Sequence, residues 1–402
     1  MPQASTTTPA AEHAQARPTT RSQLLSWLAV ASVTAGLFVI VTVEILPIGL
    51  LPEIGHSFRV TDGTAGLTMT MPGFLAALSA PVVTTATARV DRRFMLCAFM
   101  ALLVAANFLA AVAPAYWLVL VSRVLVGVTI GGFWSIGAGL AGRLVPPESV
   151  GRATAVIFSA VPLGSVLGVP AGTFVGDVAG WRTAFVALGV LSVGVWVAML
   201  VVIPPLPPEE ALRGSVLRGA LRGVGTRWAL LVTVLVVLAH FGAYTYVTPF
   251  LRQVTDVGPG LVTVFLLVYG AAGIAGNFLG GAAVVRRPRA AFAVAAGLIA
   301  VATLLLPVLG TRPVGAVVLL VVWGIAYGAV PVCSQAWFAA AVPRSPEAAS
   351  VLFTASFQAT LSLGALAGGV LVDGASPSAV MVLAGLTAVL AVAAVGLRGR
   401  TG

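Results

Sequence analysis

The amino-acid sequence predicts an all-α membrane protein in which twelve transmembrane helices form two pseudo-symmetric six-helix bundles. Hydrophobic residues make up 59% of the 402 residues and charged residues only 8%, and apolar runs of membrane-spanning length recur from end to end. The hydrocarbon core of a bilayer takes about 20 apolar residues per helix, and unpaired backbone groups are costly there. The runs lack the alternating pattern of barrel strands, so helices are predicted and a soluble fold is excluded.

Each half of the chain contains six apolar runs that are long enough to cross a bilayer. The first six predicted spans are residues 27–51, 64–86, 94–113, 116–140, 153–176 and 183–203. The second six are residues 228–251, 261–283, 290–310, 314–338, 348–372 and 378–397. An even number of spans places both ends of the chain on the same side of the membrane.

The predicted organisation has four parts. Residues 1–22 are polar and predict a disordered cytoplasmic segment, and the first apolar run is too late and too long for a cleaved signal peptide. Residues 23–203 form the predicted N-terminal bundle, and residues 228–402 form the predicted C-terminal bundle. The longest polar interruption, residues 204–227, contains prolines, two glutamates and spaced arginines, and is the predicted cytoplasmic linker.

The basic residues predict the orientation. All 22 are arginines, and alternate assignment of the loops places seventeen on one side, four on the other and Arg123 inside a span. By the positive-inside rule, both termini and the linker are expected in the cytoplasm of a multi-pass inner or plasma membrane protein. The net charge of +10 then belongs to loops that face anionic lipid, which argues against a nucleic-acid partner.

Several kinds of site are absent from the sequence pattern. Cys97 and Cys333 both lie in predicted spans and are expected in the core, without a disulfide. The three histidines are far apart, so no metal site is predicted, and a chain without lysine has no Gly-Lys phosphate loop. No catalytic set clusters at one interface, so we expect neither an enzyme nor a cofactor.

The two halves show an internal repeat. Gly127 and Gly131 in the fourth span match Gly324 and Gly328 in the tenth at an offset near 196 residues. Val145-Pro146 and the segment that follows match Val342-Pro343 at nearly the same offset. The shared offset favours duplication, as in transporters built from repeats, over the chance recurrence of glycines.

A strip of small residues marks the fifth span. Gly164, Gly168, Gly172 and Gly176 recur at every fourth position, and Pro170 removes one amide donor. Such a strip allows close approach of another helix. We expect that helix to be span 8, a contact between halves, although static packing of one bundle remains open. Span 8 has its own small-residue face, formed by Gly273, Gly276, Asn277, Gly280 and Gly281, and span 11 contributes Gly364 and Gly368.

Three ionisable residues fall inside predicted spans: Glu44, Arg123 and His240. A charge in the membrane is costly, so such residues usually line a cavity or pair with each other. Glu44 and Arg123 both lie about 10 Å from the outer ends of their spans, at about 1.5 Å per residue. One hypothesis is that Glu44 carries a proton and Arg123 adjusts its proton affinity; the alternative is a static buried pair. His240 can share the proton, contact a substrate or simply pack.

Other polar and aromatic residues in the spans are candidates for a binding site. Aromatic faces stack on flat rings, and amides match the hydrogen-bonding edges of a small heterocycle. Packing in the bundle core is the alternative role for each of them. The candidates, besides His240, are Asn107, Trp134, Tyr244, Tyr246, Asn277, Gln335 and Gln358.

Three motifs together resemble the twelve-span drug and metabolite:proton antiporters of the major facilitator superfamily. Gly164 to Gly172, with its Gly-x-Pro-x-Gly centre, is similar to the antiporter motif of that group, and Arg123 with Gly127 is similar to its span-4 motif. The segment 88–93 resembles the family's basic gating loop through Arg89, Asp91, Arg92 and Arg93. It departs at Ala88 and at Asp91, and Arg-x-Asp-Arg-Arg is the form found in the arabinose, chloramphenicol and nucleoside export branch.

Short segments, among them Glu44-Ile45-Leu46-Pro47 and Gly131-Gly132-Phe133-Trp134, look closest to purine ribonucleoside efflux pumps. The resemblance implies the superfamily's fold and a monomeric, proton-coupled efflux antiporter, with purine ribonucleosides as the first substrate expectation. Chloramphenicol-type multidrug efflux, sugar efflux and proton-coupled import by the same fold are the alternatives. A receptor or structural membrane protein is a further alternative, and it would tolerate Glu44→Gln.

Overall fold

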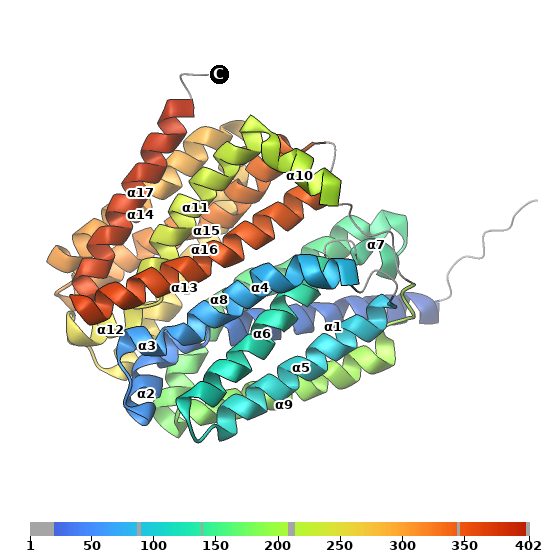
Figure 1. Ribbon diagram of the computed structural model, residues 1–402, viewed down its shortest axis with the longest axis horizontal. Coiled ribbons are helices and arrows are strands. Elements are labelled where there is room, and N and C mark those ends of the chain that lie inside the picture. Colours follow the sequence, from blue (N-terminus) through green and yellow to red (C-terminus); the bar gives the residue numbers. More distant parts are fainter. Residues whose placement is uncertain (1–19, 87–89, 138–139, 208–213, 344–345, 399–402) are drawn as a thin grey trace, which may run out of the picture.

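The computed structural model describes residues 20–86, 90–137, 140–207, 214–343 and 346–398 (Figure 1). The predicted N-terminal segment, up to residue 19, and Arg89 of the predicted gating loop lie outside the described residues. Within them the secondary structure is helical throughout.

The first half of the chain forms one bundle. Its helices are α1 (Thr20–Ile45), α2 (Pro47–Phe58), α3 (Asp62–Ala65), α4 (Leu67–Ala86), α5 (Arg92–Val112), α6 (Tyr116–Gly137), α7 (Ala141–Leu144), the 3-10 turn η1 (Pro147–Ser149), α8 (Val150–Ala179) and α9 (Trp181–Val202). A short helix, α10 (Gly214–Arg222), follows in the stretch that connects the two halves and packs against α11 and α16.

The second half forms the other bundle. Its helices are α11 (Val224–Tyr244), α12 (Val247–Gln253), α13 (Pro259–Arg286), α14 (Pro288–Leu309), α15 (Pro313–Ala341), α16 (Pro346–Gly374) and α17 (Pro377–Arg398). Eleven helices in the described part of the chain are long and apolar enough to cross a membrane. A further long helix, α4, occupies the place of the second predicted span and packs along α6 and α16.

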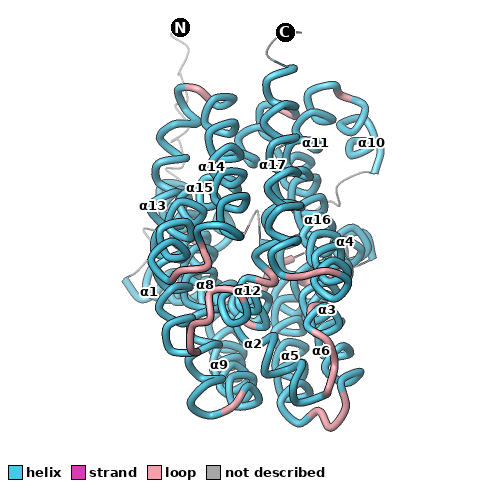
Figure 2. Tube along the Cα trace, turned by 90° about the vertical axis from the view of Figure 1, so that its left-hand side faces the viewer, coloured by secondary structure: helices cyan, strands magenta, loops and turns pink. Residues whose placement is uncertain are grey.

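The two bundles converge at one end and diverge at the other (Figure 1). They meet where α2, α3 and α12 lie, which we call the latch end, and they spread toward α7 and α10 at the opposite end. A view onto the latch end places α12 beside α2 between the bundles, and these two helices are in contact (Figure 2). Further contacts between bundles join α4 to α16 and α8 to α13.

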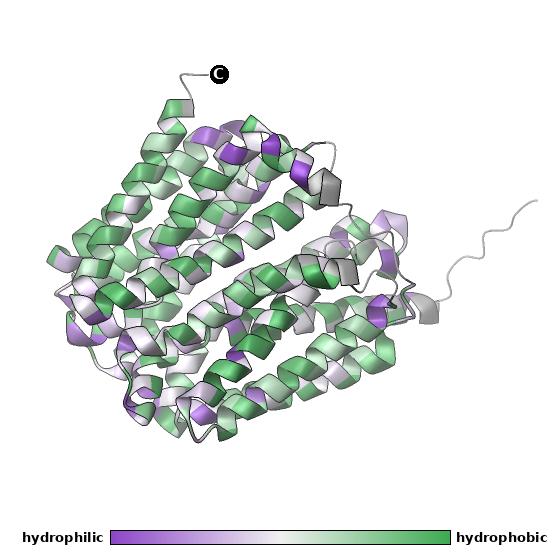
Figure 3. Ribbon diagram, viewed as in Figure 1, coloured by the Kyte–Doolittle hydropathy of each residue, from purple (hydrophilic) through white to green (hydrophobic). Residues whose placement is uncertain are grey.

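Large apolar side chains cover the outer faces of the helices. Val178, Phe278 and Val285 are 72%, 73% and 83% exposed, as expected for side chains that face lipid rather than water. Hydrophobic residues colour most of both bundles, and hydrophilic residues gather toward the helix ends (Figure 3). The arrangement is that of a multi-pass membrane protein.

The first predicted span of each half is broken, which the sequence analysis did not anticipate. Residues 27–51 were expected as one helix, but α1 ends at Ile45 and α2 begins at Pro47. Residues 228–251 are divided in the same way, because α11 ends at Tyr244 and α12 begins at Val247. Proline has no amide proton, so Pro47 cannot continue the helical hydrogen bonding of α1.

The matched glycines of the two halves each allow a neighbouring helix to approach closely. A side chain at Gly127 or Gly131 would collide with α4, on Pro72 and Ala76 respectively. A side chain at Gly324 would collide with the backbone of Tyr269 on α13. The fourth span therefore packs closely on the second, and the tenth on the eighth, as duplication requires.

The glycine strip of the fifth span faces α1 and α2 rather than span 8. A Cβ atom at Gly164 would lie 3.0 Å from Val41, and one at Gly172 would lie 2.5 Å from Leu46. The expected contact of span 5 with span 8 does exist, but it joins Val166 on α8 to Gly270 on α13. Gly168 and Gly176 likewise face Ile45 and Leu50, so the expectation for the strip itself was wrong. The small-residue face of span 8 packs within its own bundle, where Gly276 and Gly280 meet α15.

The described part of the gating loop is tied to the end of α9. Asp91 caps α5 by accepting a hydrogen bond from the Arg93 amide at 2.7 Å, and it also accepts from the Leu206 amide at 3.1 Å. The Arg93 guanidinium donates to Leu200 O at 2.6 Å, and Arg92 is buried. Asp91 therefore anchors the chain that leaves the N-terminal bundle.

Candidate functional site

Glu44 lies at the centre of the molecule and connects the two bundles. It occupies the last turn of α1, beside the break at Leu46, and is 7% exposed. Its Oε1 atom accepts a hydrogen bond of 2.9 Å from Nε2 of Gln358 on α16 in the other bundle. Glu44, the candidate proton site, and Gln358, a candidate for substrate binding, are therefore direct hydrogen-bond partners.

Arg123 on α6 is fully buried and repairs the break between α1 and α2. Its Nη2 atom donates to the backbone oxygens of Val43 and Glu44, both at 3.0 Å. In a continuous helix the amide of residue 47 would bond to Val43 O, and Pro47 has no amide proton to give. Nε of Arg123 donates to Thr68 O at 2.9 Å, which ties α4 to the same point. The guanidinium therefore holds the backbone that carries Glu44.

Two residues that contact Glu44 each have a buried polar atom without a hydrogen-bond partner within the described residues. These atoms are Nη1 of Arg123 and Oε1 of Gln358. The first is a donor and the second an acceptor. Unpartnered buried groups are costly, so they mark positions that a water, a proton or a polar ligand can satisfy.

His240 stands at the centre of an aromatic cluster in the C-terminal bundle. Nε1 of Trp323 donates a hydrogen bond of 3.1 Å to Nδ1 of His240. An indole nitrogen can only donate, so Nδ1 must be unprotonated and the ring proton must be on Nε2. This geometry makes His240 a neutral ring with one donor, and the ring is 1% exposed.

Three tyrosines complete the cluster. Tyr327 stacks on one face of the His240 ring, and Tyr244 also stacks on it, with centroids 5.1 Å apart. Tyr244 stacks in turn on Tyr269 at 4.6 Å. The sequence analysis named Tyr244 but missed Tyr269 and Tyr327. A weak signal was available, since Tyr327 directly precedes Gly328, one of the glycines matched between the halves.

The remaining binding candidates do not gather at this centre. Asn107 is buried but bonds to Ser192 at 3.3 Å within the N-terminal bundle. Trp134 packs against Phe158 there, and the Tyr246 hydroxyl donates to Ala365 O at 2.8 Å beside the latch end. The last two candidates are not buried in this conformation: Asn277 is half-buried on α13, and Gln335 is exposed on α15.

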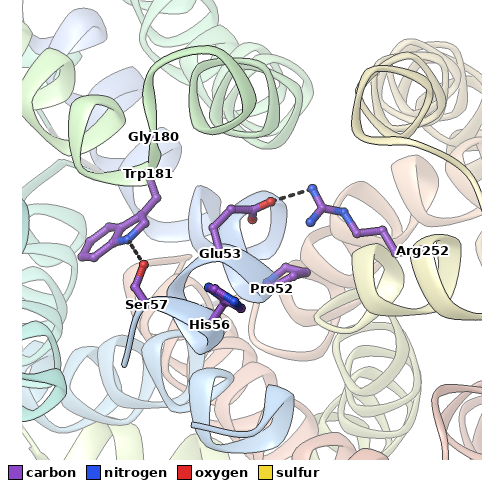
Figure 4. Close-up of a pocket in the computed structure, with 7 residues that line it drawn as sticks. All are labelled: Pro52, Glu53, His56, Ser57, Gly180, Trp181 and Arg252. Atoms are coloured by element: carbon purple, nitrogen blue, oxygen red, sulfur yellow. Dashed lines mark hydrogen bonds and ion pairs between the residues drawn. The ribbon is translucent and has the colours of Figure 1, made fainter. Parts of the chain in front are cut away.

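A second polar cluster closes the latch end. Nη2 of Arg252 on α12 lies 2.6 Å from Glu53 on α2 and 3.4 Å from Asp177 at the end of α8. Both acids belong to the N-terminal bundle, whereas Arg252 belongs to the C-terminal bundle. Glu53 and Arg252 point toward each other in the lining of a pocket of about 470 Å³ (Figure 4). Pro52, His56, Ser57, Gly180 and Trp181 complete its lining.

The latch has a second, reciprocal half. Asp373 on α16 accepts hydrogen bonds from the Thr61 hydroxyl at 2.6 Å and the Gly63 amide at 2.8 Å. Asp177 and Asp373 differ by the repeat offset of 196 residues, and each binds the opposite bundle. The convergence of the bundles brings partners to both acids at the ends of their helices.

Asp62 joins the same latch. It accepts a hydrogen bond of 2.8 Å from the side-chain amide of Gln253 on α12. Burial raises the pKa of Asp62 above its usual value of 3.8, and the carboxylates of Asp373 and Glu53 raise it further. The Gln253 hydrogen bond and the charge of Arg252 act in the opposite direction. The closed latch therefore favours the protonated form of Asp62.

Comparison with known proteins supports one family over most of the chain. A family profile described as "Major Facilitator Superfamily" matches residues 33–351. The chain is 33% identical over 352 residues to a Pseudomonas aeruginosa protein named transcription regulatory protein OpdE, covering 87% of this chain and 88% of that one. It is 30% identical over 377 residues to the purine ribonucleoside efflux pump NepI of Escherichia coli K12, covering 93% and 95%.

Solved structures show the same architecture. A bacterial homologue of the human lysosomal transporter Spinster, in an inward-facing and occupied conformation, aligns with a TM-score of 0.76 at 19% identity, covering 96% of this chain and 98% of that one. The human organic anion transporter MFSD10 aligns with a TM-score of 0.66 at 17% identity, covering 94% and 100%. At these identities the likeness concerns the fold alone.

Proposed function

The chain belongs to the major facilitator superfamily of membrane transporters, and on that premise we propose that it is a proton-driven efflux antiporter for small organic molecules. One observation carries the proposal: Glu44, the one buried carboxylate among the described residues, lies between the bundles and accepts a hydrogen bond from Gln358 of the opposite half. A transporter that alternates between two conformations needs its coupling ion to bind where the conformations differ. Glu44 meets that requirement.

The proposed cycle uses the bundles as two rocking bodies. Glu44 takes a proton from the latch side and releases it toward the opposite side, while the substrate moves the other way. Arg123 holds the backbone around Glu44 through Val43 O and Glu44 O, so that the carboxylate keeps its place while the bundles move. A positive charge beside the acid also lowers the cost of leaving the carboxylate ionised.

Purine ribonucleosides are the first substrate we propose. The named activity of the NepI relative motivates this choice, and so does the chemistry of the centre. Stacked rings of Tyr244 and Tyr269 suit a flat heterocycle, and the free atoms on Arg123 and Gln358 offer a donor and an acceptor to its edge. Phenicol antibiotics and sugars remain the comparison compounds.

The proposed location is the inner or plasma membrane, with the latch end outside and both termini in the cytoplasm. The arginine distribution supports this orientation: Arg286, Arg287 and Arg289 lie at the end of α13 and the start of α14, opposite the latch. Efflux follows from this orientation if protons enter from the latch side.

Reconstituted liposomes test the proposal. Wild-type protein is given an imposed pH gradient and a panel of purine nucleosides, chloramphenicol and sugars, and accumulation of each labelled compound is measured. We expect gradient-driven accumulation of at least one purine nucleoside by the wild type. Glu44→Gln should reduce that accumulation by at least about 100-fold, because a neutral amide cannot cycle a proton.

Glu148→Gln is the matched control. This glutamate is exposed in the turn before α8, so the same substitution there should leave accumulation unchanged. Full gradient-driven transport by Glu44→Gln would refute the proton site. Transport of another panel compound, with no movement of any nucleoside, would refute the substrate assignment and leave the proton site standing.

A further inference from the structure

We propose that Gln358 reads the protonation state of Glu44, so that a proton on Glu44 strengthens the contact between the bundles and closes the latch end. This inference rests on the proposed function and deepens it, since it assigns the step that converts proton binding into a conformational preference. Gln358 is a positioning residue in this scheme, because it acts on the proton through Glu44.

The geometry places the pair on the moving interface. Glu44 belongs to α1 and Gln358 to α16, so their 2.9 Å hydrogen bond joins the two bundles and must break when they separate. Both side chains are buried, 7% and 5% exposed, so water does not readily replace the lost bond. The same α16 carries Asp373, which closes the latch against Thr61 at 2.6 Å.

Only one of the two polar atoms of the Gln358 amide has a hydrogen-bond partner. Its Nε2 atom donates to Oε1 of Glu44, but its own Oε1 is buried with no partner in the described part of the chain. A carboxylate can only accept hydrogen bonds, so the ionised form of Glu44 cannot use that oxygen. A protonated carboxyl group can donate its O–H to the amide oxygen while its carbonyl accepts from the amide N–H.

The proton therefore changes the number of hydrogen bonds across the interface. The ionised pair makes one, and the protonated pair can make two in a cyclic acid–amide arrangement. No covalent bond changes, and the only species gained or lost is the proton on the Glu44 carboxyl. Each extra hydrogen bond typically shifts an equilibrium about two- to tenfold, so protonation favours the latch-closed conformation.

The charged and titratable groups that face Glu44 fit this scheme. Arg123 on α6 is the cation that faces Glu44, and Tyr327 on α15 is a neutral hydroxyl within electrostatic reach of it. The hydrogen bonds of Arg123 go to the backbone oxygens of Val43, Glu44 and Thr68, and the Glu44 carboxyl group accepts its hydrogen bond from Gln358. A substrate that takes the amide of Gln358 removes the second hydrogen bond, so substrate binding and proton binding oppose each other, as antiport requires.

Distance measurements by electron paramagnetic resonance test the inference on the full-length protein. Spin labels are attached at Ala179→Cys, at the end of α8, and at Gly260→Cys, at the start of α13, in a Cys97→Ser, Cys333→Ser background. Both label sites are exposed at the latch end, one on each bundle. The latch-closed fraction is measured across a pH series.

We expect the ratio of closed to open protein to rise about five-fold as the pH falls through the titration of Glu44. Gln358→Met, of similar length but without hydrogen-bonding atoms, should leave only the small pH dependence that comes from Asp62 in the latch. Gln358→Glu should restore the full response, because two carboxyl groups can share one proton. Glu44→Gln should stay closed at every pH, since two amides form the same two hydrogen bonds.

Ser356→Ala is the control on the same helix. The Ser356 hydroxyl donates to Phe353 O within α16, so its loss should leave the pH response as in the wild type. A Gln358→Met protein that is folded and still closes with falling pH as fully as the wild type would overturn the inference while the proton site stands. A Glu44→Gln protein that still accumulates substrate on a pH gradient would instead overturn the proposed function.

Discussion

The two bundles have the same arrangement of helices, but the residues beside the break in the first span of each bundle differ in chemistry. In the N-terminal bundle the break between α1 and α2 is held by the buried guanidinium of Arg123, next to the acid Glu44. In the C-terminal bundle the break between α11 and α12 lies beside neutral rings, with His240 bonded to Trp323. One half can hold a charge and the other a flat ring. The two halves keep matching glycine contacts although the chemistry of their centres differs.

The largest expected effect comes from removing the guanidinium. Arg123→Leu leaves three buried carbonyl oxygens, on Val43, Glu44 and Thr68, without their donor. Each orphaned group costs about 1–3 kcal/mol, so we expect a loss of at least about 3 kcal/mol in unfolding free energy. Thermal unfolding in detergent measures it. Arg123→Lys should have a stability between those of the wild type and Arg123→Leu. The three donors of an ammonium group sit on one nitrogen, whereas the guanidinium reaches these oxygens from two nitrogens.

A stable Arg123→Leu protein would show that the break does not depend on the charge. Neither helix break would then need a charged group to stabilise it, and this difference between the bundles would disappear.

The next effect compares two glycines at the same place in the repeat. Gly172 on α8 and Gly368 on α16 are separated by the offset of 196 residues. A Cβ atom at Gly172 would meet the flexible end of Leu46, whereas one at Gly368 would meet Gly242 O and the ring of Tyr246. Backbone and an aromatic ring move less readily, so Gly368→Ala should be the more destabilising, by about 1–3 kcal/mol.

Measuring both alanine variants by thermal unfolding sharpens the comparison. If Gly172→Ala proved the more destabilising, the helix break in the N-terminal bundle would be the tighter of the two.

A smaller effect is expected from Trp323→Phe. The change removes the indole donor to Nδ1 of His240, at a cost of about 1 kcal/mol, and keeps most of the ring packing. Nδ1 then has no donor and the ring can adopt either tautomer, so substrate binding should weaken about five-fold. Equilibrium binding of a labelled substrate measures it. An unchanged binding curve would show that the tautomer of His240 plays no part.

The smallest effect concerns Asp62 in the latch. Because the closed latch raises the pKa of Asp62 above 3.8, closure binds a proton that the open, solvated latch releases. Asp62 therefore contributes to closure at low pH, and the contribution is lost as the pH rises through the raised pKa. Asp62→Asn should weaken the pH response of the latch-end distance without abolishing it. A pH response equal to that of the wild type would remove Asp62 from the latch chemistry.

The sequence predicted the order of the helices and the duplicated glycine contacts because both depend on local patterns. Long apolar runs identify spans, and Gly127 and Gly324 mark close helix approaches within each half. The sequence also singled out Glu44 and Arg123 as ionisable residues in an apolar setting. What it could not provide were contacts between distant segments, such as Glu44 with Gln358, 314 residues apart.

The helix breaks and the latch were missed for related physical reasons. Hydropathy is the same on both sides of Leu46, so the run appeared continuous although Pro47 interrupts the hydrogen bonding. The latch contacts of Asp177 and Asp373 could not be predicted, because no local feature of the sequence shows that the opposite bundle reaches them. Gln335 and Asn277 were predicted to line a binding site because they are polar residues in spans. Gln335 is exposed and Asn277 half-buried, since a polar residue in a span need not face the centre of the bundle.

The most direct test of the central claim is to count protons as substrate binds. Purified protein in weakly buffered detergent solution receives the compound that the liposome panel identifies, and a pH-sensitive dye follows the protons released. If Glu44 is the site where proton and substrate oppose each other, the wild type releases up to about one proton per bound substrate, and Glu44→Gln binds substrate with no release. Equal release by the wild type and Glu44→Gln would contradict the account.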